Sequence, residues 1–162
     1  MAGVAHYDGV TVEIIVEPTF NYLSEQRATP RRITVRIRRV LDSLFAVATP
    51  ADFIVWAHNL GVGRNLILSR ELASACARWN IPLVSHHHDW WFDKRWARWP
   101  GMRRAGFRTL RATAEAVFPS VGDVVHAAIN QADAKILAAH GGNRALWLPN
   151  LSEPASPPIT PR

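Results

Sequence analysis

Short apolar runs that alternate with helix-like segments constrain the fold of this chain more than any other feature. Three runs are mostly apolar and too short for helices, as buried parallel strands are: 52–59, 82–85 and 124–129. Apolar residues at helical spacing follow these runs, at 66–79, 102–117 and 131–140. This alternation predicts an α/β fold with a Rossmann-like open, mostly parallel sheet and helices on both faces.

The segments on either side extend the pattern. A partly alternating, β-branched stretch predicts a strand at 10–16, and helical spacing of apolar residues predicts a helix at 33–48. A last strand is expected at 145–148, before a proline-rich tail. We therefore expect one domain over 1–150 and a flexible tail over 151–162.

Charge narrows the classes of partner. The chain carries 19 Lys and Arg against 13 Asp and Glu, a net charge of +6, and its pI is about 10.7. Such a charge favours phosphates or an anionic membrane surface, although arginine runs on helices are also typical of solvated faces. The sequence holds no recognisable nucleic-acid-binding module, so nucleic acid is not an expected partner.

The cellular location follows from what the sequence lacks. No apolar run approaches the roughly 20 residues that cross a bilayer, and the first residues lack a signal-peptide pattern. The single cysteine, Cys76, excludes a disulfide framework and fits a small buried hydrophobe. We expect a cytoplasmic location, including peripheral contact with the inner face of the membrane.

Polar residues follow three of the predicted strands. His58 and Asn59 end the first, residues 86–89 follow the second, and Asn130 follows the third. In open parallel sheets, ligands bind beyond the carboxyl ends of the strands. These residues are therefore the first candidates for a site.

The run SHHHDWW, which begins at Ser85, has three interpretations. In an extended segment His86 and His88 share one face, so with Asp89 they could ligate a metal, and His58 could fold in beside them. One histidine could instead act as a general base on a substrate hydroxyl, with Asp89 orienting it or binding a sugar hydroxyl. His87 could simply be satisfied in the core. Because no second cluster has metal-ligand spacing, we expect no metal.

The turn after the first strand contains Gly61, Gly63 and Asn65. Glycines let backbone N–H groups approach a ligand, and a helix N-terminus favours anions, so the three are candidates for binding the phosphates of a nucleotide. The turn lacks the residues of a P-loop and the third glycine of a dinucleotide fingerprint. The alternative is a tight connection in which Asn59 and Asn65 are caps.

The tryptophan-rich loop at 90–99 alternates wide rings with cations. Trp90, Arg95 and Arg98 are candidates for contacting an acceptor at the mouth of the cleft, because rings suit sugar faces and cations suit anionic groups. In the alternative interpretation the loop only shields the sheet, with Trp96 and Trp99 sealing it.

Four stretches in this order resemble the N-terminal domain of family 4 retaining glycosyltransferases of the two-Rossmann-domain (GT-B) type. They are WAHNLGVGRN, PLVSHHHDWWFDKRWARWP, HAAINQADAKIL and LWLPN. In that family a strand ending in His-Asn or His precedes a helix, a second strand ends in His-Asp, a later one ends in Asn or Ser, and a closing strand ends in Pro-Asn. The resemblance covers about 52–150.

The resemblance implies a function and a set of site residues. It implies a hexosyltransferase-type enzyme that moves a sugar from a nucleotide-sugar donor to a glycan or lipid acceptor, with no required cofactor. His88 and Asp89 match the region that faces the transfer centre and would be catalytic. The acceptor would be bound by residues of the same cleft: His58, Asn59, His86, Trp90, Arg95 and Asn130.

Two departures from the family pattern bear on completeness. The strand at 10–16 matches the family's second strand, and Asp8-Gly9 is a poor substitute for the glycine-rich loop after the first. The donor-binding domain has no counterpart in the sequence. We therefore expect a fragment, a degenerate copy or one half of a split enzyme, inactive alone and paired with a separate donor-binding domain or subunit. The alternative function is a non-catalytic module that binds a glycan or a phosphate-bearing ligand.

Overall fold

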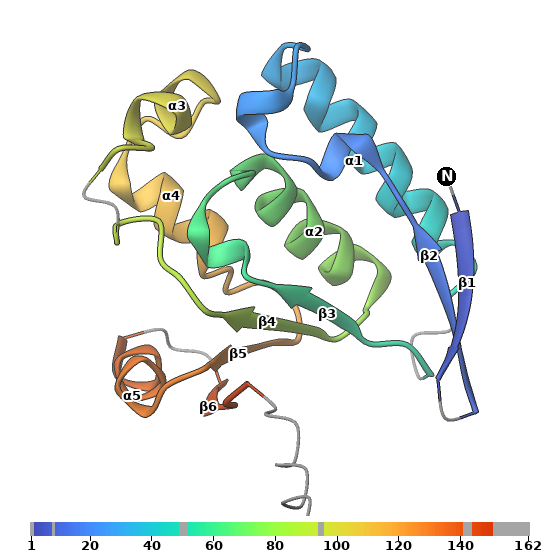
Figure 1. The fold of residues 1–162 in the computed structure, drawn as a ribbon. Helices are drawn as coiled ribbons and strands as arrows, with labels where there is room; N and C mark the ends of the chain where they lie inside the picture. Colours follow the sequence, from blue (N-terminus) through green and yellow to red (C-terminus); the bar gives the residue numbers. More distant parts are fainter. Residues whose placement is uncertain (1, 8, 49–51, 94–95, 141–143, 151–162) are drawn as a thin grey trace, which may run out of the picture.

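The predicted fold class is confirmed. A computed structural model describes residues 2–7, 9–48, 52–93, 96–140 and 144–150. Four parallel strands form an open sheet in the order β3-β4-β5-β6 (Figure 1). Their bounds are Val55–His58 for β3, Leu83–His87 for β4, Val124–Ala128 for β5 and Arg144–Trp147 for β6. The bounds of all four strands lie within three residues of the predicted ones. The predicted tail at 151–162 lies outside the described residues.

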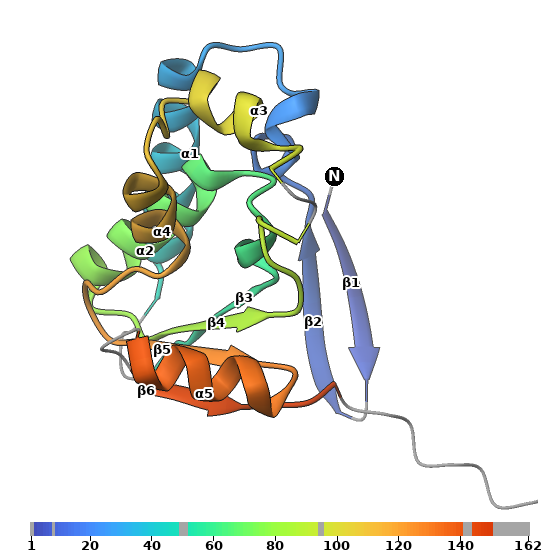
Figure 2. The ribbon, with the colours of Figure 1, turned by 90° about the vertical axis from the view of Figure 1, so that its left-hand side faces the viewer.

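Helices connect and cover the strands. The α-helices are α1 (Pro30–Phe45), α2 (Leu66–Trp79), α3 (Trp99–Arg104), α4 (Leu110–Val117) and α5 (Gln131–His140). The 3-10 turns are η1 (Pro18–Phe20), η2 (Leu23–Glu25) and η4 (Leu60–Val62). Helices α1, α2 and α4 are stacked on one side of the sheet in Figure 1, and α5 packs along β5 and β6 (Figure 2). None of the helices in the described ranges is long and apolar enough to cross a membrane.

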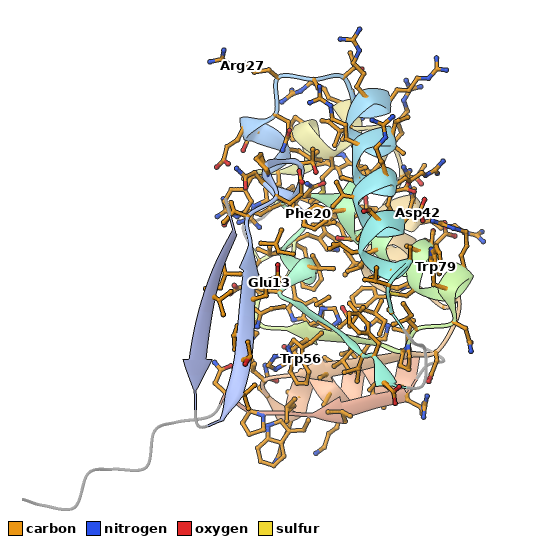
Figure 3. The ribbon with its side chains drawn as sticks, turned by 90° about the vertical axis from the view of Figure 1, so that its right-hand side faces the viewer. Glu13, Phe20, Arg27, Asp42, Trp56 and Trp79 are labelled. Atoms are coloured by element: carbon orange, nitrogen blue, oxygen red, sulfur yellow. The ribbon has the colours of Figure 1, made fainter. Side chains whose placement is uncertain are left out.

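Helix α1 shows how sequence pattern becomes packing. Its buried residues recur every four positions, at Ile33, Ile37, Leu41 and Phe45, which gives it one apolar face. That face packs toward α2. The arginines of α1 are exposed, and Arg38 reaches α2, where it pairs with Glu71. At its far end Asp42 accepts hydrogen bonds from Trp79 Nε1, at 3.2 Å, and from Arg78, at 2.7 Å (Figure 3).

The single helix predicted at 102–117 is wrong, because the chain forms two helices there, α3 and α4. Gly106 lies between them with a φ of 102°, a conformation that interrupts a right-handed helix. Thr109 then starts α4, since its side chain accepts a hydrogen bond from the backbone N–H of Ala112. The continuous apolar spacing across 102–117 hid this break.

The strand predicted at 10–16 is present as β2 (Val10–Ile15), but it does not join the parallel sheet. It pairs antiparallel with β1 (Ala2–Tyr7), a strand that the sequence analysis did not predict. Gly9, with a φ of 82°, lies in the turn between them, as a glycine after aspartate commonly does in a hairpin. Exposed apolar side chains on this hairpin include Val10 and Ile14.

Candidate functional site

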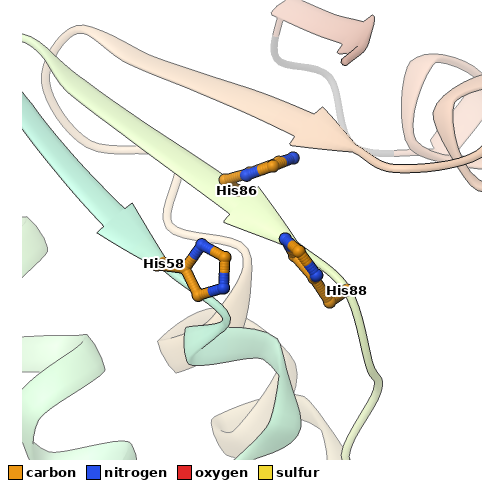
Figure 4. Close-up of side chains that lie close together, drawn as sticks. All are labelled: His58, His86 and His88. Atoms are coloured by element: carbon orange, nitrogen blue, oxygen red, sulfur yellow. The ribbon is translucent and has the colours of Figure 1, made fainter. Parts of the chain in front are cut away.

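The strand register brings three histidines together. His58 on β3 pairs with His86 on β4, and neighbours in a parallel register point to the same face. His88 is two residues beyond His86, so it returns to that face. The ring centroids of His58 and His88 are 4.2 Å apart, and those of His86 and His88 are 4.6 Å apart (Figure 4). One nitrogen from each ring lies within 4.8 Å of the other two.

The three rings differ in environment. His86 is buried, with 5% of its surface exposed, and its Nε2 lies 3.0 Å from the backbone oxygen of Leu148. Because a carbonyl oxygen can only accept, that Nε2 carries the hydrogen and the Nδ1 of a neutral His86 has a free lone pair. His58 is exposed. His88 is half-buried, and its Nε2 has no hydrogen-bond partner among the described residues.

The pKa of His88 lies below its usual range. Removal from water disfavours the charged form first, and the neighbouring His58 and His86 disfavour it further. Asp89 acts in the opposite direction with a smaller effect. At neutral pH His88 is therefore a neutral ring with an available lone pair.

Asn59 joins the ends of β3 and β4. It adopts a left-handed conformation with a φ of 56°, which asparagine tolerates better than most residues. Its Oδ1 accepts from the backbone N–H groups of His88, at 3.3 Å, and Asp89, at 3.0 Å. Its Nδ2 donates to Asp89 Oδ2 at 2.9 Å. Asn59 thus fixes the exposed Asp89 carboxylate beside the histidines, and its predicted contact with an acceptor stays a prediction.

Trp90 and Asn130 are linked through Asp133 at the start of α5. Trp90 is buried, stacks on His87 with ring centroids 4.8 Å apart, and donates from Nε1 to Asp133 Oδ2 at 2.9 Å. Asn130 donates to the same oxygen at 2.7 Å, and its Oδ1 accepts from the Asp133 N–H. Trp90 therefore links the loop after β4 to α5, whereas Asn130 bonds locally at the start of α5. Their predicted acceptor contacts stay predictions.

Gly61, Gly63 and Asn65 all make contacts within the protein. Asn65 caps α2, since its Oδ1 accepts from Leu68 N at 3.0 Å, and its Nδ2 donates to the backbone oxygen of Asn21 at 2.8 Å. A Cβ on Gly61 would lie 2.7 Å from His87 Nδ1. Gly63 has a φ of 70°, and a Cβ there would lie 2.5 Å from Met102 Cε. These are the contacts of a tight connection, and the phosphate-binding role stays a prediction.

His87, the middle residue of the histidine run, points to the other face. Only 1% of its surface is exposed, and its Nε2 lies 2.9 Å from His126 Nδ1 on β5. Burial lowers the pKa of His87 to about 3, with a further contribution from His126. His87 therefore lies in the core, as expected, but its Nδ1 has no hydrogen-bond partner among the described residues, so the ring is only partly satisfied. Sequence reasoning missed its partner, because pairing across β4 and β5 depends on register.

A cleft of about 550 Å³ between η2, the start of α1 and α3 was also missed by sequence reasoning. Its lining includes Tyr22, Gly63, Arg64, Arg98 and Arg104. Arg64 lies over the Tyr22 ring at 4.4 Å, and Arg98 donates to the backbone oxygen of Val62 at 2.8 Å. The cleft thus combines an aromatic ring with three cations.

The tryptophan loop is partly described. Trp91 is buried and packs against Trp96 and Trp99, with ring centroids 5.3 and 6.3 Å apart. Trp96 keeps nearly half of its surface exposed. Arg95, predicted to contact an acceptor, lies outside the described residues. These three tryptophan rings pack on one another, whereas Trp90 and Arg98 contact residues outside the loop.

Comparison with known proteins gives no match: no family model, no curated protein and no solved structure is significantly similar to this chain.

Proposed function

We propose that this chain is the acceptor-binding half of a retaining glycosyltransferase of the two-Rossmann-domain type. The observation that carries the proposal is the cluster of polar side chains at the carboxyl ends of β3 and β4, where open parallel sheets bind ligands. The reaction class comes from the resemblance of the four strand-end motifs, in their order along the sequence, to those of family 4 glycosyltransferases. The donor-binding half is supplied by a separate domain or subunit.

Asp89 and His88 are the proposed catalytic pair. Asp89 is exposed and held by Asn59, so its carboxylate is positioned to accept a hydrogen bond from a hydroxyl of the acceptor sugar. His88 is neutral at physiological pH, so it can take the proton that the acceptor hydroxyl loses when its oxygen bonds to the transferred sugar. Departure of the nucleoside diphosphate depends on the donor-binding half.

The experiment that tests this function measures acceptor binding by the chain alone. A panel of glycans and polyprenyl phosphates is titrated by calorimetry, and Asp89→Asn is expected to weaken the best binder by about tenfold, the loss of a charge-assisted hydrogen bond. Asp52→Asn, at another exposed aspartate, is the matched control and is expected to leave binding unchanged.

A second measurement tests the assignment to half an enzyme. With nucleotide sugars and the bound acceptor, the isolated chain is expected to release no nucleoside diphosphate above background. Turnover by the chain alone would contradict the proposal, and so would a lack of binding to every acceptor in the panel. A donor-binding domain encoded directly downstream would support it over a non-catalytic glycan-binding module.

The arginine-lined cleft predicts contact with anionic lipid or lipid phosphate. Replacing Arg64, Arg98 and Arg104 together with alanine is expected to weaken binding to vesicles containing 30% phosphatidylserine. The expected loss is about fivefold per arginine, because each cation near such a surface contributes about 1 kcal/mol. Co-sedimentation at 0.1 M salt measures it.

The matched control removes the same charge from α1, with Arg31, Arg32 and Arg39 replaced by alanine. These three also line one shallow surface pocket along α1. An equal loss from both triple variants would mean that binding depends on net charge and not on the cleft. Unchanged binding in the cleft variant would reject the membrane contact altogether.

A further inference from the structure

The face shared by His58, His86 and His88 presents three imidazole rings and no carboxylate among them. Their placement follows from the fold, since the β3–β4 register fixes His58 beside His86 and strand alternation returns His88 to the same face. His87, between the last two, points to the opposite face and pairs with His126. In the run of three histidines, the rings of His86 and His88 therefore lie on the face of His58, and the ring of His87 lies in the core.

His86 and His88 each have a ring nitrogen that is available to a cation. The Leu148 carbonyl occupies Nε2 of His86 and leaves Nδ1 as the lone-pair nitrogen. A backbone carbonyl that accepts from the other ring nitrogen is the usual support of a metal-bound histidine. Nε2 of His88 is buried without a hydrogen-bond partner in the described part of the chain, a state that proteins rarely leave unexplained.

We propose that His58, His86 and His88 bind a divalent transition-metal ion, with Zn²⁺ the best match. Imidazole nitrogens suit zinc, whereas calcium and magnesium prefer oxygen ligands. Three ligands leave a fourth tetrahedral position, which would hold water, and the exposed His58 gives solvent access to the group.

The distances require only a small adjustment. Nitrogen atoms bound to one tetrahedral zinc lie roughly 3.3 Å apart, given Zn–N bonds of about 2.0–2.1 Å. The three nitrogens here lie within 4.8 Å of one another. Rotation of the His58 and His88 rings, which are exposed and half-buried, closes that difference without moving the strands.

This site goes beyond the proposed function and does not depend on it. It also replaces the expectation from the sequence that no metal binds. The sequence grouped His86, His88 and Asp89 as possible ligands, with His58 able to fold in beside them. The register places His58 beside His86, and Asp89 accepts a hydrogen bond from Asn59. A metal-bound His88 has no lone pair left to accept a proton, so the proposed role of His88 as a base applies to the chain without metal.

The test is zinc titration of the chain after dialysis against a chelator. We expect one ion per chain by calorimetry, and Co²⁺ in place of zinc should give the intense visible absorption of a tetrahedral site. His58→Gln and His88→Gln are each expected to weaken binding by more than tenfold, the lower end of what loss of even a supporting residue causes. Both positions are accessible, so circular dichroism should show that the variants remain folded.

His87→Gln is the matched control, because it alters the same histidine run at the ring that faces the core. It is expected to keep zinc binding within about twofold. The chain unfolded in urea provides a second control and is expected to bind at least tenfold more weakly, since only the fold brings His58 to the other two.

Three results would overturn the proposal. They are no binding at 100 µM zinc, stoichiometric binding that survives in the His58→Gln/His88→Gln double variant, and equal affinity of the folded and unfolded chains. None of these measurements uses an acceptor or a nucleotide sugar. A failure here therefore leaves the proposed transferase function untouched, and the reverse also holds.

Discussion

Replacing both Arg38 and Arg70 with alanine is expected to lower the free energy of unfolding by about 3–5 kcal/mol, the cost of leaving a buried charge unpaired. Glu71 on α2 is only 1% exposed. Arg38 Nε lies 2.5 Å from its Oε2, and Arg70 NH2 lies 2.8 Å from its Oε1, so each carboxylate oxygen has its own cation. Without the two arginines the carboxylate keeps its burial and loses both partners.

Removing Glu71 instead of the two arginines is expected to change the free energy of unfolding only slightly. Both arginine side chains are about half exposed, at 57% and 47%, so they return to water when Glu71 is absent. Glu71→Met fills the space with an apolar side chain of similar length, and the expected change is within about 1 kcal/mol in either direction. A large effect of removing the arginines with a small effect of removing Glu71 would indicate an unpaired buried charge. A simple loss of contacts would give similar effects from both changes.

Urea unfolding followed by circular dichroism measures both effects. Arg111→Ala is the control, since both Arg111 and its partner Glu115 are exposed and such pairs contribute little to stability. A loss below about 1 kcal/mol in the Arg38→Ala/Arg70→Ala variant would show that water reaches Glu71. A loss of several kcal/mol in Glu71→Met would show that the pair itself stabilises the fold.

The parallel sheet was predictable because its strands are buried and its helices are amphipathic. Helix α2 was placed at the observed bounds, and β3 was found from its apolar run. The break between α3 and α4 was not predictable from periodicity, because both helices bury residues in the same core. It depends on the backbone at Gly106. Only β2 of the hairpin β1–β2 was predicted from the sequence. Strand β1 was not predicted, and it pairs with β2 outside the parallel sheet.

The location of the site was predictable from the sequence, but the contacts between its side chains were not. Topology alone places residues after β3, β4 and β5 at one edge of the sheet, which identified His58, residues 86–89 and Asn130 in advance. Which histidines meet depends on register, and a slip of one residue would have paired His87 with His58. The structural use of Asn59 depends on its left-handed backbone, a property that the sequence does not show.

Acidification is expected to destabilise this fold through the buried pair His87 and His126. Burial lowers the pKa of His87 from an ordinary 6.5 to about 3, and burial lowers the pKa of His126 as well. Between pH 6.5 and about pH 3, His87 binds a proton in the unfolded chain but not in the folded chain. The contribution of the neutral ring to the free energy of unfolding is therefore complete above pH 6.5 and decreases as the pH falls toward 3. His87 alone corresponds to a loss of about 2 kcal/mol between pH 7.5 and pH 5, at 1.36 kcal/mol per pH unit, and His126 acts in the same direction.

Urea unfolding at pH 7.5, 6.5 and 5 measures this loss, and a His87→Gln/His126→Gln variant tests its cause. Glutamine can hydrogen-bond at both positions and does not titrate, so the variant is expected to lose less stability than the unmodified chain between pH 7.5 and pH 5, whatever its absolute stability. His58→Gln is the matched control, because it removes an exposed histidine from the opposite face and should leave the acid dependence of His87 in place. Stability that is constant or rises toward pH 5 in the unmodified chain would contradict the assignment. It would mean that the paired rings can share a proton, Nε2 of His87 to Nδ1 of His126, without opening the core.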